Sequence, residues 1–152
     1  MRMIDRFLPP VIDNAYRGRR AALWIFGFLI FMKTAMSLNS IFNGDVVATS
    51  ADGLPLDTYP PGAAQTIVSL FAIWGLGHLM LCLLSLLALV RYRSMVPFMF
   101  ALLLIEHLSR RLIFRLMPIP RTGSPPAPVI NLILLTLMVT GLALSLWRRP
   151  TV

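Results

Sequence analysis

Five ionisable side chains lie within ten positions of one otherwise apolar stretch, residues 95–117. They are Glu106, His107, Arg110, Arg111 and Arg115. Arginine binds carboxylate and phosphate groups in a bidentate way, and histidine can carry a proton or bind a metal. These residue types at this spacing fit anion binding, proton transfer or ion pairing inside the protein.

Two other apolar stretches carry one basic group each, Lys33 in residues 21–42 and His78 in residues 65–90. Counted from the expected cytoplasmic ends of the stretches, Lys33, His78 and Glu106 each lie 12 residues in. At about 1.5 Å per residue this depth is about 18 Å, near the middle of a bilayer. The sequence thus predicts one polar layer, made by Lys33, His78, Glu106 and His107, with Thr136 and Thr140 within a turn of the same level.

Angles around a helix suggest how these side chains pair. Glu106 and Arg110 lie one turn apart on one face, so we expect an ion pair between them. Lys33 is a second candidate partner for Glu106, and a triad of the three would keep a net positive charge. His107 and Arg111 form a second stripe about 100° round the helix.

The two outermost arginines of the stretch, Arg111 and Arg115, fall toward its outer end. They are expected either to reach outer-leaflet phosphates or to point into the bundle. The net positive charge of the triad Lys33–Glu106–Arg110 would favour an anion, a lipid headgroup, a lowered lysine pKa or a neutral histidine nearby. The alternative is that the charges only fix how the helices pack.

We expect these ionisable side chains to lie on membrane-spanning helices. The chain is 57% hydrophobic and 13% charged, with a mean hydropathy of +0.77. About 20 apolar residues cross a bilayer as a helix. Four stretches are long enough, and the expected spans are residues 21–42, 65–90, 95–117 and 130–147. We expect an all-α integral membrane four-helix bundle with antiparallel up-down topology, in one domain (21–149) after a basic leader (1–20).

Basic residues give the expected orientation. Nine of the fourteen Lys and Arg residues flank the spans on one side, whereas the outer loops, 43–64 and 118–129, hold only Arg121. Positive residues favour the cytoplasmic side, so both termini are expected there. The compact, loop-poor chain favours a bacterial inner (plasma) membrane. The nine residues are Arg2, Arg6, Arg17, Arg19, Arg20, Arg91, Arg93, Arg148 and Arg149.

Three small residues carry local predictions. Gly75 and Gly77 should let a neighbouring backbone approach closely, as small residues do between membrane helices. Ser94 is placed to cap the helix that follows it.

The favoured function is a binding or accessory module. Its positive polar layer would hold a lipid headgroup, another anionic ligand or a membrane partner. The formal charge of +8 could suggest nucleic acid, but the basic residues flank spans and leave no long basic face, so no nucleic-acid partner is expected.

Three alternatives remain open. His78 and His107, on adjacent antiparallel helices, could clamp a b-type haem in an electron carrier, with Arg110 or Arg111 near a propionate. The same histidines and Glu106 could relay protons in a transporter or channel acting as a dimer. An enzyme is less favoured, because the sequence lacks H-E-x-x-H, G-x-S-x-G, a phosphate-binding glycine loop and a cysteine pair.

Overall fold

The computed structural model describes residues 7, 9 and 11–147. Much of the predicted leader (1–6, 8 and 10) and the tail (148–152) therefore lie outside the described residues, and so do Arg2, Arg6, Arg148 and Arg149. All regular elements within the described part of the chain are helical. The expectation of an all-α protein is confirmed to that extent.

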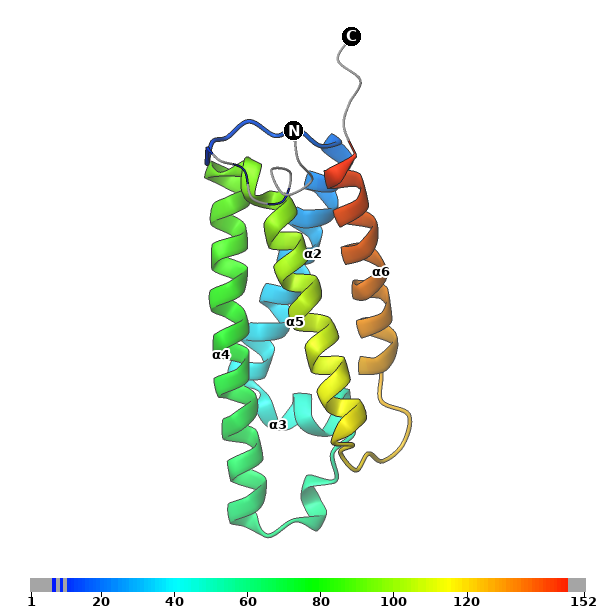
Figure 1. Ribbon diagram of the computed structural model, residues 1–152. Coiled ribbons are helices and arrows are strands. Elements are labelled where there is room, and N and C mark those ends of the chain that lie inside the picture. The colour runs from blue at the N-terminus through cyan, green and yellow to red at the C-terminus, as the bar shows by residue number, and fades with distance from the viewer. Residues whose placement is uncertain (1–6, 8, 10, 148–152) are drawn as a thin grey trace.

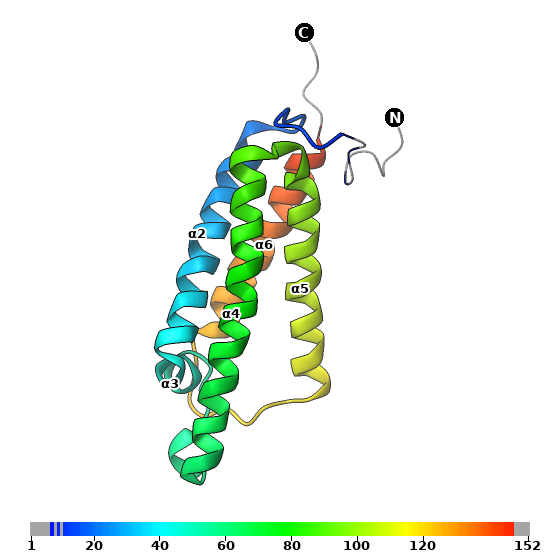
Figure 2. The same ribbon diagram turned by 90° about the vertical axis from the view of Figure 1, so that its left-hand side faces the viewer.

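Four long helices run side by side (Figures 1 and 2). They are α2 (Arg20–Phe42), α4 (Pro61–Arg91), α5 (Val96–Leu116) and α6 (Ala127–Leu146). Helix α2 packs against α4 and α6, and α5 packs against α6 and less extensively against α4. Each helix begins and ends within four residues of an expected span.

Three of these helices, α2, α4 and α6, are long and apolar enough to cross a membrane. Helix α5 has 21 residues but differs because it carries Glu106, Arg110, Arg111 and Arg115 in its second half. The chain is thus an integral membrane protein by the length and composition of three helices.

Short helical segments fill the connections. The link between α2 and α4 contains α3 (Gly44–Val46), one π-helical turn (Val47–Ala51) and one 3-10 turn (Leu56–Thr58). A 3-10 turn (Arg93–Met95) joins α4 to α5. Helix α4 starts earlier than expected, at Pro61. Proline is compatible with this position, because the N–H groups of a first helical turn have no partner within the helix.

The two ends of the molecule are formed by different connecting segments. One end, here called the Arg91 end, gathers the segment 11–19 and the α4–α5 turn (Figure 1). Trp147 also lies there, because the Arg19 guanidinium is 4.6 Å from its ring centroid. The opposite end, here called the Arg121 end, holds α3 and the segment 117–126 (Figure 1).

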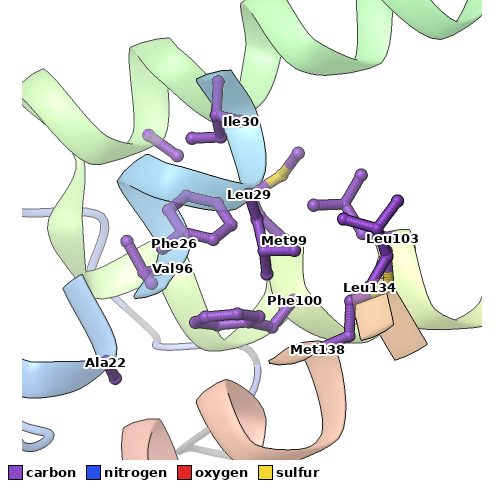
Figure 3. Close-up of a cluster of buried hydrophobic side chains, with 11 residues drawn as sticks. Ala22, Phe26, Leu29, Ile30, Val96, Met99, Phe100, Leu103, Leu134 and Met138 are labelled. Atoms are coloured by element: carbon purple, nitrogen blue, oxygen red, sulfur yellow. The ribbon is translucent and has the colours of Figure 1, made fainter. Parts of the chain in front are cut away.

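Apolar packing is concentrated in the half of the molecule nearer the Arg91 end. Figure 3 shows the side chains of this cluster. The rings of Phe26 and Phe100 lie 4.7 Å apart, and Phe100 packs directly over Gly141, where a larger residue would collide with it. The buried cluster comprises Ala22, Phe26, Leu29, Ile30, Ala88, Val96, Met99, Phe100, Leu103, Leu134 and Met138.

Ser94 does not cap α5 as predicted. Its hydroxyl donates to the Asp13 carbonyl (2.8 Å) and accepts the Asp13 N–H (3.0 Å), and the Ser94 N–H also reaches that carbonyl (3.3 Å). Met95 is the residue at the cap position, with no side-chain hydrogen bond. Ser94 instead attaches the N-terminal segment to the α4–α5 turn.

The prediction for the two glycines of α4 is confirmed at one and wrong at the other. A Cβ at Gly75 would lie 2.9 Å from both the Ser37 carbonyl and the Ser40 Cβ, so Gly75 allows α2 and α4 to approach closely. Gly77 has nothing within 4 Å of that position. The close approach at Gly75 occurs one turn from His78 and brings it beside α2.

At the Arg121 end two connections are joined by hydrogen bonds. The Thr122 N–H donates to the Gly53 carbonyl (2.7 Å), and the Thr122 hydroxyl donates to the same oxygen (3.2 Å). Gly53 has φ +75°, a conformation that favours glycine, and a Cβ there would lie 2.9 Å from the Thr122 carbonyl. The joined loops place Asp52 and Arg121 next to the polar interior.

Candidate functional site

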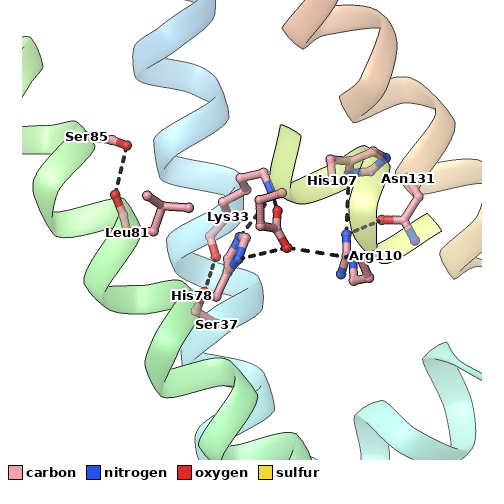
Figure 4. Close-up of polar contacts among 9 residues, drawn as sticks. Lys33, Ser37, His78, Leu81, Ser85, His107, Arg110 and Asn131 are labelled. Atoms are coloured by element: carbon pink, nitrogen blue, oxygen red, sulfur yellow. Dashed lines mark hydrogen bonds and ion pairs between the residues drawn. The ribbon is translucent and has the colours of Figure 1, made fainter. Parts of the chain in front are cut away.

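One carboxylate, that of Glu106, is shared by basic groups from three helices (Figure 4). Its Oε2 lies 3.6 Å from Lys33 Nζ of α2, and its Oε1 lies 3.7 Å from His78 Nδ1 of α4. Arg110 Nε, one turn further along α5, is 3.9 Å from the same Oε1. The expected Glu106–Arg110 ion pair and the triad with Lys33 are therefore present.

Lys33 is only 2% exposed and also contacts His78 directly, with 3.0 Å between Nζ and Nε2. An ammonium group has donors only, so His78 Nε2 is the acceptor in this contact. The proton of the neutral imidazole then sits on Nδ1, the atom that faces Glu106. Lys33, His78 and Glu106 thus form a closed polar triangle between three helices.

Arg110 connects this triangle to α6. Its Nη2 lies 3.4 Å from His107 Nδ1 and 3.5 Å from Asn131 Oδ1 (Figure 4). Its guanidinium also stacks over the Trp74 ring of α4, 5.0 Å from the centroid. Because arginine has no acceptor, His107 accepts through Nδ1 and carries its proton on Nε2 when neutral.

Three cavities meet at Arg110 and Asn131, which line all of them. A central cavity of about 190 Å³ reaches Lys33 and His78. A second, here called the basic cavity, has about 160 Å³ and is lined by His107, Arg110, Arg111, Phe114, Arg121, Pro128 and Asn131. The third, of about 460 Å³, lies between α4 and α5.

The charge around these cavities is formally positive. Four cationic side chains face two carboxylates, those of Glu106 and Asp52, so two positive charges are left over. The cationic residues are Lys33, Arg110, Arg111 and Arg121. Burial raises the pKa of the Asp52 carboxyl, although Arg121 and Arg110 act in the opposite direction. Partial protonation of Asp52 would only increase the positive surplus.

The structure brings together most of the residues singled out in the sequence. Lys33, His78, Glu106, His107 and Arg110 form one contact network.

The two outer arginines of α5 differ from each other. Arg111 lies beside the network, where it lines the basic cavity. Arg115 is exposed and lines none of the three cavities. Both side chains are exposed, and only Arg111 contributes to a cavity, so the choice between pointing into the bundle and reaching outer-leaflet phosphates stays a prediction.

The predicted contribution of Thr136 and Thr140 is wrong. Both are exposed, and the Thr136 hydroxyl donates to the Leu132 carbonyl of its own helix. The fourth helix contributes Asn131 instead, because α6 turns that face toward Arg110.

Four residues at the site were not singled out by the sequence: Trp74, Asn131, Asp52 and Arg121. Trp74 lies one turn before His78, and Asn131 is a polar residue in a plain apolar span, so both had a weak signal in the pattern. Asp52 and Arg121 depend on the folding of two connections, for which the sequence carries no periodic signal.

The two histidines line different cavities, His78 the central cavity and His107 the basic cavity. Each contacts a cationic side chain through one ring nitrogen. The haem alternative stays a prediction. For metal ions generally, the described part of the chain holds no group of three or more His, Cys, Asp or Glu side chains placed to bind one.

Comparisons with protein-family models, with curated proteins and with solved structures give no match to this chain. The chemistry that the site can perform is therefore argued from its geometry. It offers arginine donors around a cavity, a carboxylate that neutralises only part of their charge, and a set of ionisable groups in contact across three helices.

Proposed function

We propose that this protein is a small integral membrane protein that binds an anionic, phosphate-type group in the basic cavity. The observation that carries this proposal is the composition of that cavity: Arg110, Arg111 and Arg121 line it with His107, and none of its described lining residues is acidic. Guanidinium groups bind phosphate oxygens in a bidentate way, and they do so more strongly where water is scarce.

In this proposal α5 is a fourth membrane span, antiparallel to α4. Its 21 residues extend about 31 Å, enough for the hydrocarbon core. Two of its charged groups, Glu106 and Arg110, have partners on other helices, which lowers the cost of placing them in a membrane. The Arg91 end carries Arg17, Arg19, Arg20, Arg91 and Arg93 and would be cytoplasmic, in a bacterial inner membrane.

With that orientation the basic cavity lies toward the outer leaflet. Arg121 belongs to the connection at the Arg121 end, and its guanidinium lies 5.8 Å from the Phe114 ring centroid. The bound group would therefore sit at the level of outer-leaflet headgroups. It could belong to a lipid or be a free phosphate, since the recognition chemistry is the same.

Calorimetric titration of the detergent-solubilised protein tests the proposal. One arm uses inorganic phosphate and the other uses phosphatidylglycerol in mixed micelles. We expect saturable binding that weakens at least tenfold in R111Q/R121Q. The matched control is R91Q/R93Q, which removes two arginines from the other end and should bind like the wild type. Equal weakening in both variants, or no saturable binding in either arm, would reject the proposal.

A second candidate function is proton-coupled transport by a dimer. The observation in its favour is the unbroken series of contacts from Lys33 through His78, Glu106 and Arg110 to His107. One oxygen of Glu106, Oε2, is buried with no hydrogen-bond partner in the described chain and lies 3.6 Å from Lys33 Nζ. Proteoliposomes in which phosphate uptake is independent of a pH gradient, with wild type and E106Q alike, would remove this candidate.

A further inference from the structure

The largest of the three cavities opens between α4 and α5. We call it the lateral cavity, and its volume is about 460 Å³. Its apolar wall is formed by Leu70, Phe71 and Trp74 of α4 and by Ile113 and Phe114 of α5. Leu70 and Ile113 are 58% and 54% exposed, so neither is covered by another part of the described chain.

The cavity exists because α4 and α5 diverge. The two helices are close at the Arg91 end, where a short turn joins them, and they separate toward the Arg121 end in both views (Figures 1 and 2). Large apolar side chains line the lateral cavity, and Leu70 and Ile113 among them are exposed. In a bilayer, this opening would face the acyl chains of the surrounding lipids.

The lateral cavity and the basic cavity share a boundary. Arg110, Phe114 and Asn131 line both. Two arginine–aromatic contacts lie along this boundary, Arg110 over Trp74 at 5.0 Å and Arg121 over Phe114 at 5.8 Å. The positive charge of the basic cavity therefore adjoins the apolar wall of the lateral cavity, which Asp52, Glu106 and Ser109 also line.

From this juxtaposition we infer that the bound anion is the headgroup of a phospholipid-type amphiphile, whose acyl chain lies in the lateral cavity between α4 and α5. The inference rests on the proposed function and specifies its ligand. Charge complementarity selects the headgroup, because two positive charges around the cavities are not balanced by Glu106 and Asp52. The apolar wall beside Arg110 selects a ligand with a tail over a free anion.

The test uses phosphatidylglycerol with a photoactivatable diazirine in its acyl chain, in phosphatidylcholine nanodiscs that contain the wild-type protein. We expect cross-links concentrated on Leu70, Phe71, Ile113 and Phe114. They should exceed by at least fivefold those on Ile133 and Val139, which are equally exposed residues of α6. Equal labelling of the two faces would overturn the inference, because the chain would then be ordinary surrounding lipid.

A blocking variant, L70W/I113W, separates this inference from the proposed function. Filling the lateral cavity should weaken phosphatidylglycerol binding at least tenfold and leave the binding of inorganic phosphate unchanged. The matched control I133W/V139W should bind both like the wild type. If L70W/I113W keeps phosphatidylglycerol, the tail site is wrong while the anion site stands. If wild-type protein binds neither probe, both proposals fall.

Discussion

The same four helices enclose apolar side chains in one half of this molecule and ionisable side chains in the other. Near the Arg91 end, α2, α5 and α6 enclose an apolar cluster around Phe26 and Phe100, and Gly141 lets α6 approach the Phe100 ring. Near the Arg121 end these helices and α4 enclose ionisable groups and three cavities. Helix α5 takes part in both, because its buried apolar side chains end at Leu103 and its charged side chains begin at Glu106.

The difference shows how a small helical protein can hold a polar site. Close packing at one end fixes the angles of the helices, and their divergence at the other end makes room for charged side chains. Hydrogen bonds between Gly53 and Thr122 then join the connections across the open end. The packed half holds the buried apolar cluster and the open half holds the ionisable groups, so changes in the two halves should affect different measurements.

The largest effect on stability is expected from F100A. Removing the fully buried ring leaves a cavity beside Phe26 and Gly141 and should lower the free energy of unfolding by about 3–5 kcal/mol. F114A, at the open end, is the matched change. Phe114 is 41% exposed, so its loss should cost about 1 kcal/mol or less. Unfolding in mixed micelles with increasing SDS measures both, and equal losses would contradict the division into two halves.

The next largest effect should follow from E106Q. Without the carboxylate, Lys33 and Arg110 face each other with no counter-charge, which should lower the free energy of unfolding by about 2–3 kcal/mol. The same variant should bind phosphate more tightly, because a competing negative charge is gone.

The double variant K33M/E106Q is the control for that explanation. Removing the second charge should recover at least half of the lost stability, since no unpaired ammonium group remains. Additive losses in the double variant would show that Lys33 and Glu106 do not interact.

A smaller effect is expected from S94A. The substitution removes the hydroxyl that both donates to and accepts from the Asp13 backbone, and should cost about 1 kcal/mol. It should also speed proteolysis between residues 11 and 19. S69A is the matched control, because the exposed Ser69 hydroxyl donates only to a carbonyl of its own helix. Identical proteolysis rates for the two variants would contradict the attachment.

The smallest effect is expected from D52N, and it depends on pH. Burial raises the pKa of Asp52, so the folded protein holds this proton more tightly than the unfolded chain does. Burying the ionised Asp52 lowers the free energy of unfolding. This loss is absent below the ordinary carboxyl pKa of about 4 and develops as the pH rises through the higher pKa of the folded protein. D52N should therefore be slightly more stable than wild type at pH 7 and equal to it near pH 4.

The exposed Asp57 of the same connection provides the control for the pH effect. D57N should show the wild-type dependence of thermal stability on pH between 4 and 7. If the thermal stability of D52N depends on pH in the same way as that of the wild type, burial of Asp52 does not affect the free energy of unfolding.

The sequence predicts the helix positions and the shared level of Lys33, His78 and Glu106 well. Hydropathy, prolines and basic turns mark the ends of each helix, and a constant rise per residue places Lys33, His78 and Glu106 at one level, where the structure has them in contact. Depth along an axis says nothing about which face of a helix turns inward. That choice depends on how the helices diverge, so Asn131 was missed in favour of Thr136 and Thr140.

Contacts made by the connections were also beyond the sequence. Ser94 bonds to Asp13, 81 residues away, and the joining of the two connections at the Arg121 end needs Gly53 and Thr122 to meet. Such pairings depend on the arrangement of the long helices, and no local pattern specifies them.

The central claim is that the basic cavity holds an anionic headgroup, and native mass spectrometry tests it most directly. Wild type, R111Q/R121Q and R91Q/R93Q would be released from equal mixtures of phosphatidylglycerol and phosphatidylcholine. We predict one retained phosphatidylglycerol on the wild type and on R91Q/R93Q, and loss of that lipid from R111Q/R121Q. Equal retention of the two lipids by the wild type, or undiminished phosphatidylglycerol on R111Q/R121Q, would contradict the claim.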